Sequence, residues 1–424
     1  MNSNKFWTAG IGALAVVMLA LFANLSLSPS AEAQTYRVLY SFAGQPDGDR
    51  PLARVVFDSQ GNLYGTTRVG GSNGAGSVFK LAPNPDGSWT ESVLYSFHCC
   101  ADAYFPFAGL ILDGQGNLYG TTVNGGGIGQ CGGYSGCGTV FKLTANPDGS
   151  WSESILHSFT GGKDGGQPAG PLISDSAGNL YSTTVWGGAS GLGVVFKLKP
   201  NPDGSWTERV LHSFKGKPCK NPEAGLVLDA TGNLYGTTFL GGSHNSGTVF
   251  QLTPNPGGSW TSKVLHAFNG GSGGAKPLSD LIFDPAGNLY GTTFNGGHRD
   301  AGTIFELAPG PQGWTFSILY RFRDKEGTNP RDGLVIDPAG NLYGTTSLDS
   351  GGMGHGTVYK LSPNPDGTWT ETILHQFQGG SDGGEADSSL IRDAAGNLYG
   401  TTAGYHNLGC NDIDGCGTVF EVTP

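Results

Sequence analysis

The stretch GNLYGTTVNGG, residues 116–126, returns along this chain in seven closely similar copies. It sets β-branched and aromatic residues between glycines, a composition that favours a short strand ending in a turn and disfavours a helix. A repeat of 53 to 62 residues is typical of propellers, solenoids and other arrays. The first glycine of each copy is Gly61, Gly116, Gly178, Gly232, Gly287, Gly340 or Gly396.

Each copy contains four short β-type runs in a fixed order. In the second copy these are 109–113 (GLILD), 117–123 (NLYGTTV), 139–144 (TVFKLT) and 151–159 (WSESILHSF). Asp-x-x-Gly-Asn joins the first run to the second, and Asn-Pro-Asp-Gly joins the third to the fourth, and both are tight-turn sequences. Four strands joined in this way predict one antiparallel sheet per copy.

The two ends of the repeat region are complementary. Residues 36–42 (YRVLYSF) repeat a fourth strand with no strands before it, whereas the last copy ends after its third strand at 418–424. Since one such sheet has two apolar faces, only neighbouring sheets can bury them. We predict an all-β, seven-bladed β-propeller of four-stranded antiparallel blades, closed by pairing of the N-terminal strand with the C-terminal blade. An open solenoid is the alternative, and it would need capping repeats.

The combination of GNLYGTT, GG, GTVFKL, a tryptophan and VLYSF resembles the GloVer (Gloeo_Verruco-type) tandem-repeat proteins over the whole of residues 34–424. The Gly-Gly pair after the second strand and the tryptophan that opens the fourth are also similar to kelch propellers. The resemblance implies a secreted bacterial protein with β-propeller-like repeats. It brings no established activity with it.

The N-terminus has the pattern of an export signal. Lys5 precedes an apolar run, 9–27, and Ala31-Glu32-Ala33 is a small-x-small cleavage site. We expect a signal peptide at 1–33 and a single propeller domain at 34–424, in a secreted or periplasmic protein. An uncleaved membrane anchor is the alternative, because the apolar run is nearly long enough to span a bilayer.

The charge balance excludes two classes of partner. The formal net charge is −11 and the pI is about 5.2, so the phosphates of nucleic acids and anionic membranes would repel this surface. We expect no binding to nucleic acid and no membrane insertion after signal cleavage.

The cysteines agree with export. Cys131 and Cys137 enclose five residues in one loop, and Cys410 and Cys416 enclose five in the equivalent loop of the last copy. This placement predicts two local disulfides, which form in an oxidising compartment. The pairing of Cys99, Cys100 and Cys219 stays open.

Residues that recur in every copy are predicted to be structural, because a site needs one asymmetric cluster and a recurring residue occupies equivalent places around the ring. The aspartates open turns, the tryptophans pack between blades, and the histidines replace a tyrosine of the fourth strand. They are Asp58, Asp113, Asp175, Asp229, Asp284, Asp337 and Asp393; Trp89, Trp151, Trp206, Trp260, Trp314 and Trp369; His157, His212, His266 and His375.

The copies differ in two classes of loop, which emerge on the same face of a propeller. These loops join the second strand to the third and each blade to the next, and binding residues concentrate on such loops. We predict a ligand surface there. Its candidate residues are Tyr104, Phe105, Tyr134, Trp186, His244, His298, Arg299, Asp300, His355, Tyr405 and His406.

Metal and cofactor signals are weak. One histidine stands in each loop between the second and third strands of blades four to seven, but four separate loops rarely converge on one ion, and solvated loop histidines are the simpler interpretation. Asp412 and Asp414 start a calcium-loop pattern that lacks its distal glutamate. The chain has no nucleophile elbow, zinc-protease motif or phosphate loop. We expect no metal and no cofactor.

These observations favour a monomeric, non-catalytic propeller that binds an extracellular glycan, polymer or protein through its variable loops. One alternative is a propeller enzyme that acts on polysaccharide, a lyase or glycosidase. The other is a structural component of an envelope or matrix. The first strands of the copies are apolar, as in "LIL", "LVL" and "LIF", so we expect little acid-base chemistry at the axis.

Overall fold

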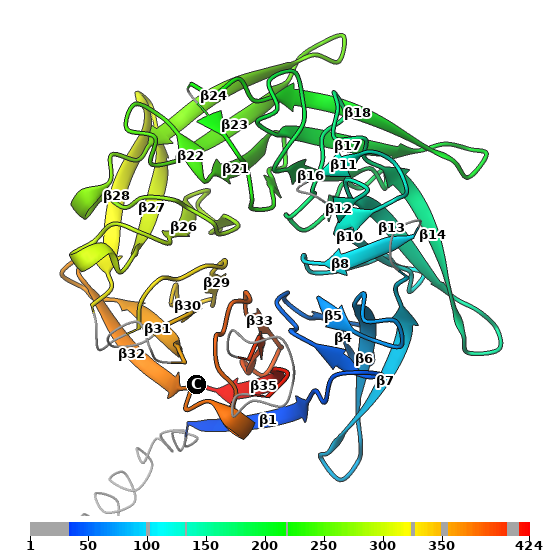
Figure 1. Ribbon diagram of the computed structural model, residues 1–424. Coiled ribbons are helices and arrows are strands. Elements are labelled where there is room, and N and C mark those ends of the chain that lie inside the picture. Colours follow the sequence, from blue (N-terminus) through cyan, green and yellow to red (C-terminus); the bar gives the residue numbers. More distant parts are fainter. Residues whose placement is uncertain are drawn as a thin grey trace, which may run out of the picture.

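The chain forms a ring of seven four-stranded antiparallel sheets around a central axis (Figure 1). The computed structural model describes residues 34–98, 102–131, 134–217, 219–323, 327–348, 355–404 and 415–424. The predicted all-β class, the seven blades and their four-stranded antiparallel sheets are confirmed. No helix in these described ranges is long and apolar enough to cross a membrane.

Each blade runs from a two-residue strand at the axis to a long strand at the rim. The blades, from axis to rim, are β3 (Val56–Phe57), β4 (Leu63–Thr67), β6 (Ser77–Pro83), β7 (Trp89–Ser96); β9 (Ile111–Leu112), β10 (Leu118–Gly125), β13 (Thr139–Ala145), β14 (Trp151–Ser158); β15 (Ile173–Ser174), β16 (Leu180–Thr184), β17 (Val194–Pro200), β18 (Trp206–Ser213); β20 (Val227–Leu228), β21 (Leu234–Thr238), β23 (Thr248–Pro254), β24 (Trp260–Ala267); β25 (Ile282–Phe283), β26 (Leu289–Thr293), β27 (Thr303–Gly310), β28 (Gly313–Arg321); β29 (Val335–Ile336), β30 (Leu342–Thr346), β31 (Thr357–Pro363), β32 (Trp369–Gln376); and β33 (Ile391–Arg392), β34 (Leu398–Thr402), β35 (Thr418–Thr423), β1 (Thr35–Ser41).

Short elements decorate the loops. They are β2 (Gly48–Asp49) paired with β5 (Val69–Gly70), β8 (Ala103–Pro106) paired with β10, β11 (Gln130–Cys131) with β12 (Tyr134–Ser135), β19 (Cys219–Lys220) with β22 (Leu240–Gly241), and the 3-10 turns η1 (Gly271–Gly273), η2 (His298–Asp300) and η3 (Gly380–Asp382).

The ring closes where the two ends of the chain meet. Strand β1 pairs antiparallel with β35, from Thr35 opposite Thr423 to Ser41 opposite Thr418, so the first strand completes blade 7 (Figure 1). This confirms the predicted closure. It also removes an open module edge to which another chain could add.

The repeated aspartate is a turn residue, as predicted. Asp58 accepts hydrogen bonds through Oδ1 from the backbone N–H groups of Gln60 and Asn62, at 2.8 and 2.9 Å. Its Oδ2 accepts from Asn62 Nδ2 at 2.7 Å and from the Tyr64 hydroxyl at 3.1 Å. The bond between this carboxylate and the tyrosine recurs at Asp113, Asp175, Asp229, Asp284, Asp337 and Asp393.

The tryptophan that opens the rim strand packs between blades, as predicted. The ring of Trp151 in blade 2 lies 6.5 Å from Tyr64 in blade 1, and Trp206 lies 6.3 Å from Tyr119 in the same edge-to-face manner. Fully buried phenylalanines such as Phe79 and Phe141 fill the space between the sheets. The core is therefore a set of seven similar interfaces.

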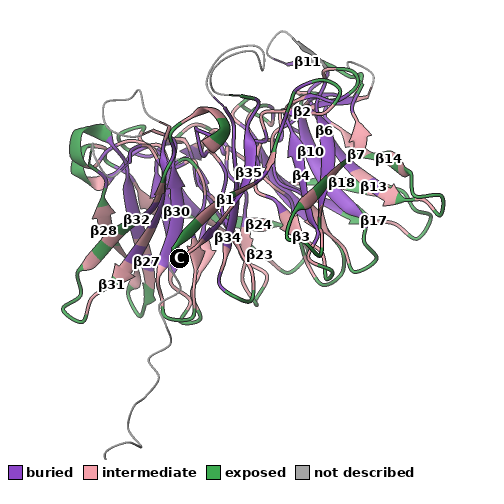
Figure 2. Ribbon diagram, turned by 90° about the horizontal axis from the view of Figure 1, so that it is seen from below, coloured by how far each residue is buried: buried purple, intermediate pink, exposed green. Residues whose placement is uncertain are grey.

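The two faces of the ring differ. Tight hairpins form one face, and the longer loops gather on the opposite face, which we call the loop face (Figure 2). Backbone bonds tie the two loop classes together there: Phe97 donates to the Gly76 carbonyl at 3.0 Å, and Gly138 accepts from Phe159 at 2.9 Å. The predicted common face for the variable loops is confirmed.

Candidate functional site

A cavity of about 250 Å³ occupies the axis at the loop face, and all seven blades line it. We call this cavity the axial chamber. Its lining combines charged side chains of both signs with small or apolar residues. The charged residues are Arg50, Arg54, Arg68, Arg331, Glu223, Asp280, Asp332, Glu385 and Asp387.

A repeated backbone bend brings these residues to the axis. The first residue of each bend has a left-handed φ between 53° and 61°, which is uncommon for a residue other than glycine. Arg50 shows how the bend is held: its N–H donates to the carbonyl of Cys416 in blade 7 at 2.9 Å, and its own carbonyl accepts from Arg68 at 3.0 Å. The seven bend residues are Arg50, Phe105, Gln167, Asn221, Lys276, Asn329 and Glu385.

Four residues after each bend, the chain contributes one residue to a ring that encircles the axis. We call these seven residues the waist ring: Arg54, Gly109, Pro171, Gly225, Asp280, Gly333 and Ser389. Arg54, Asp280 and Ser389 line both the axial chamber and a second cavity of about 430 Å³ on the hairpin side, so the ring separates the two.

Glycines in the waist ring make room for their larger neighbours. A Cβ atom on Gly109 would lie 2.7 Å from Cγ of Arg54, and one on Gly225 would lie 2.9 Å from Oδ1 of Asp280. A Cβ on Gly333 would lie 3.2 Å from Oγ of Ser389. Alternation of glycine with larger residues therefore fixes where the charged side chains lie, and it breaks the symmetry of the repeats.

Two carboxyl groups stand close together in the chamber. Asp280 accepts from the Gly225 N–H at 2.5 Å, while Asp332 accepts from the Gly333 N–H at 2.8 Å and from the Ser389 hydroxyl at 2.6 Å. Burial raises the pKa of Asp280, and the Arg54 guanidinium opposes this rise. Burial, together with the negative charge of Asp280, raises the pKa of Asp332.

Some charged groups in the chamber lack a direct partner in the part of the chain that the structure describes. No hydrogen bond or ion pair reaches the Arg54 guanidinium or the Glu223 carboxylate there, and none reaches Oδ2 of Asp280. Arg331 differs, because it donates to Asp387 at 3.0 Å. Burial raises the pKa of Glu223, and the positive charge of Arg331 opposes this rise. The chamber thus presents unpaired charges of both signs.

This site corrects the expectation that the axis is apolar. The apolar runs line only the hairpin-side cavity, through residues such as Val227, Ile282 and Val335. The charged residues precede these runs in the sequence, and at the waist position of Arg54 and Asp280 the other copies carry glycine, proline or serine. A comparison of the seven copies at the waist position could have revealed Arg54 and Asp280, because they are the two charged residues at that position.

The predicted loop residues occupy separate places, and no described member of that set lines the chamber. Trp186 is 49% exposed, whereas Tyr104 is only 6% exposed and packs in the core between blades 1 and 2. Phe105 is a bend residue and lies under the Arg68 guanidinium at 5.7 Å. His244, His298, Arg299 and Asp300 are exposed, His355 is half-buried, Tyr134 belongs to β12, and Tyr405 and His406 lie outside the described residues.

The structure brings together no predicted metal site. Within the described ranges, no group of three or more His, Cys, Asp or Glu side chains is placed to hold a metal ion. His244 contacts Ser243 of its own loop, and Asp300 accepts from Asn295 of its own loop. The calcium-loop candidates Asp412 and Asp414 lie outside the described residues.

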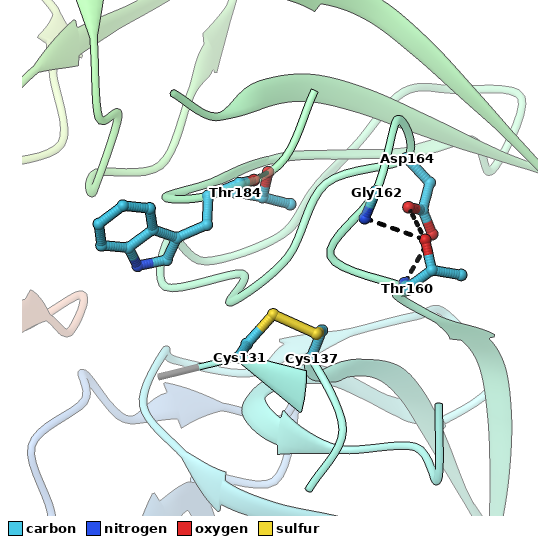
Figure 3. The surroundings of a disulfide bond; sticks show 7 residues. Cys131, Cys137, Thr160, Gly162, Asp164 and Thr184 are labelled. Atoms are coloured by element: carbon cyan, nitrogen blue, oxygen red, sulfur yellow. Dashed lines mark hydrogen bonds between the residues drawn. A yellow bond between two sulfur atoms is a disulfide. The ribbon is translucent and has the colours of Figure 1, made fainter. Parts of the chain in front are cut away.

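One predicted disulfide is present in full. Cys131 and Cys137 are bonded, with Cα atoms 5.1 Å apart, and they pack on the turn that carries Thr160, Gly162 and Asp164 (Figure 3). Cys416 is also disulfide-bonded. Its predicted partner Cys410 lies outside the described residues, as do Cys99 and Cys100, and Cys219 is a buried free thiol.

Comparisons with known proteins agree with the repeat. A family model described as the Gloeobacter/Verrucomicrobia repeat matches residues 26–132, 127–347 and 310–424. No curated protein matches the chain.

Solved structures share the fold at low identity. The extracellular domain of a protein assigned as a one-component system of Bacteroides thetaiotaomicron is 10% identical, with a TM-score of 0.52, over 91% of this chain and 40% of that one. An ancestral GH74 enzyme is 10% identical, with a TM-score of 0.50, over 86% and 55%. PorZ, a surface component of the type-IX secretion system of Porphyromonas gingivalis, is 17% identical, with a TM-score of 0.48, over 90% and 47%. Identity this low shows the propeller fold alone.

Proposed function

The chain belongs to the Gloeobacter/Verrucomicrobia repeat family, and from this membership and its axial chamber we propose that it is a binding protein that acts outside the cytoplasm. The ligand is polar and enters the chamber from the loop face. The observation that carries the proposal is the set of charged side chains Arg54, Glu223 and Asp280 in the chamber lining: in the described ranges, neither Arg54 nor Glu223 has a direct partner, and Asp280 has no cationic one.

The energetics support a ligand site. An enclosed charge without a direct partner costs folding free energy, so natural chains retain such charges mainly where they serve a function. The fold itself does not require them, since the waist position is glycine in three blades. A ligand that supplies the missing hydrogen bonds would offset the cost.

Two features support action outside the cytoplasm. The disulfide between Cys131 and Cys137 is of a kind that persists in oxidising compartments. The N-terminal residues also have the charge and hydropathy pattern of an export signal. We propose a secreted or periplasmic monomer, without partners among nucleic acids.

The loops around the chamber extend the proposed site. A ligand larger than the chamber, such as the end of a glycan, another polymer or a protein segment, would continue onto the loop face and meet exposed side chains such as Trp186 and His298. Indole rings supply large contact area in such surfaces. We propose that the chamber orients the ligand and that these loops increase the affinity for it.

The test compares matched variants of the mature chain on glycan and peptide arrays, followed by calorimetry. Loss of a hydrogen bond to a charged group costs about 1.5–3 kcal/mol, so Arg54→Gln and Asp280→Asn should each weaken a ligand at least about tenfold. The exposed controls Arg209→Gln and Asp148→Asn should leave its affinity unchanged. A ligand that ignores both chamber variants but is lost in Trp186→Ala would contradict the proposal.

One observation favours a second candidate, an enzyme that acts on polysaccharide. Asp280 and Asp332 form a carboxyl pair in which the charge of one raises the pKa of the other, and glycosidases commonly use two carboxyl groups. Release of reducing sugar from a polysaccharide by the wild-type chain, and its loss in Asp332→Asn, would support this candidate.

A further inference from the structure

Arg54 lies across the axial chamber from two acidic residues. Blade 1 supplies Arg54 together with Arg50 and Arg68, and blades 4 and 5, on the opposite side of the axis, supply Glu223 and Asp280 (Figure 1). Blades 2 and 3, between them, contribute only uncharged lining residues, such as Phe107 and Pro171. Blade 6 adds Arg331 and Asp332 and blade 7 adds Glu385 and Asp387, so both signs occur there, whereas Arg54 lies opposite Glu223 and Asp280.

Arg54 and Asp280 face each other without closing into an ion pair. Burial raises the pKa of Asp280 and the Arg54 guanidinium opposes this rise, so the two charges are close enough to interact. Among the described residues, however, no hydrogen bond or close ion pair joins them, although the structure has such pairs elsewhere, as between Arg331 and Asp387 at 3.0 Å.

We infer that the axial chamber selects a small ligand that carries a carboxylate and an ammonium group together, such as a free α-amino acid or a dipeptide. This inference rests on the proposed function, which places the ligand in the chamber. The planar guanidinium of Arg54 matches a carboxylate in a two-bond geometry. Asp280 and Glu223 supply acceptors for the ammonium group.

Ligands of a single charge fit less well. An anion that binds Arg54 would face Asp280 and Glu223 across the chamber, and a cation that binds Asp280 would face Arg54. Each would therefore gain attraction on one side and repulsion on the other. With all groups ionised, the four arginines and five carboxylates that line the chamber nearly balance, so neither sign dominates.

Neutral ligands do not neutralise the charges of the chamber. A sugar hydroxyl can form hydrogen bonds to Arg54 and Asp280, but it neutralises neither charge. A dipolar ligand instead forms a direct charge-assisted hydrogen bond to each of them. The volume also favours a small ligand. Sites for small molecules usually span roughly 300–1,000 Å³, and the chamber, at about 250 Å³, lies just below that range.

The experiment is calorimetric titration of residues 34–424 with the standard α-amino acids and with Ala-Ala. The tightest ligand is then compared with its N-acetyl and methyl-ester forms. The free dipolar form should bind at least about tenfold more tightly than either blocked form. In Asp280→Asn, the N-acetyl form should bind as tightly as the free ligand. In Arg54→Gln, the methyl ester should bind as tightly as the free ligand. Asp148→Asn and Arg209→Gln are the controls, since both residues are exposed outside the chamber. Both should still bind the free ligand more tightly than either blocked form.

Glu223→Gln is a second acidic variant, and its fold is at little risk because the Glu223 carboxylate makes no hydrogen bond in the described ranges. Failure of every amino acid and of Ala-Ala to give saturable heat would overturn the inference, as would equal affinity for blocked and free forms. Glucose, N-acetylglucosamine and glucuronate provide the distinguishing arm. If a sugar binds and both chamber variants abolish its binding, the proposed function stands and the inference fails. If both variants leave every ligand's affinity unchanged, the proposed function and the inference both fail.

Discussion

The ring of Tyr36, in the first strand, stacks on the imidazole of His375 in blade 6, with centroids 3.6 Å apart and planes inclined by 3°. The Tyr36 hydroxyl also donates to the Asp382 carbonyl at 2.5 Å. The strand that closes blade 7 is therefore joined to the preceding blade by side chains as well as to β35 by its backbone. We expect this seam to contribute measurably to stability.

Tyr36→Ala should lower the free energy of unfolding by about 2 kcal/mol, because it removes a partly buried ring and an aromatic pair. Urea denaturation measures this loss. Tyr36→Phe is the control, since it keeps the stacking and removes only the hydroxyl, and it should cost less than the alanine variant. Equal stability of Tyr36→Ala and the parent chain would mean that the contacts of Tyr36 do not stabilise the fold.

A carboxyl pair between blades 1 and 2 predicts a loss of stability in alkali. The Tyr95 hydroxyl lies 3.0 Å from Glu153 and 3.2 Å from Asp102. Burial, then the hydrogen bond to Asp102 and its charge, raises the pKa of Glu153 from 4.5 to about 9. Since the folded state holds this proton more tightly than the unfolded state, the contribution is fully present below pH 4.5 and is lost as the pH rises to about 9.

Glu153→Gln, which stays uncharged and keeps the shape of the side chain, should flatten that part of the pH dependence. Chemical denaturation at a series of pH values between 4.5 and 9 measures it. The exposed Asp148→Asn variant should keep the slope of the parent. An unchanged slope in Glu153→Gln would show that this glutamate ionises normally in the folded chain.

His266 predicts the opposite response, to acid. Its ring stacks on Phe316 at 3.6 Å, and burial lowers its pKa from 6.5 to about 4. The folded state therefore prefers the neutral imidazole, so this contribution is complete above pH 6.5 and is lost as the pH falls toward 4. His266→Tyr places there the residue that blades 1 and 5 carry, and it should move the acid-unfolding midpoint to lower pH. A midpoint that stays in place would contradict the assignment.

The waist ring predicts that a single methyl group will displace Arg54. Gly109→Ala would put a Cβ 2.7 Å from the Arg54 side chain, so the arginine must move. We expect a loss of stability of about 1–3 kcal/mol and weaker ligand binding. Gly114→Ala is the matched control, because no atom lies within 4 Å of its Cβ position. Parallel thermal denaturation and calorimetry measure both effects.

Much of the fold could be predicted because the sequence states it seven times. The Asp58 turn, the packing of Trp151 and the pairing of residues 36–42 with the last strand follow from turn chemistry and from the count of strands. The similarity to kelch propellers and the roles of the exposed loop residues stay predictions.

The chamber could not be predicted in the same way. A comparison of the copies could single out Arg54 and Asp280, but only the three-dimensional ring shows that they line one chamber with no direct ion pair between them in the described ranges. The bends also escape local rules. A residue before proline normally adopts an extended conformation, yet Gln167 has a φ of 55°, because its N–H is held by the Cys137 carbonyl and its own carbonyl by Val185. Cys137 belongs to the preceding blade, so its bond to Gln167 leaves no local sequence signal.

The union of β1 and β35 in one blade has a consequence for biosynthesis. While the ribosome is still adding the residues of the ring, β1 has no partner, because the strand that receives it is the last strand of the ring to be made. The ring can therefore close only after β35 has left the ribosome, and until then the earlier blades lack the contact that joins the first strand to the last blade.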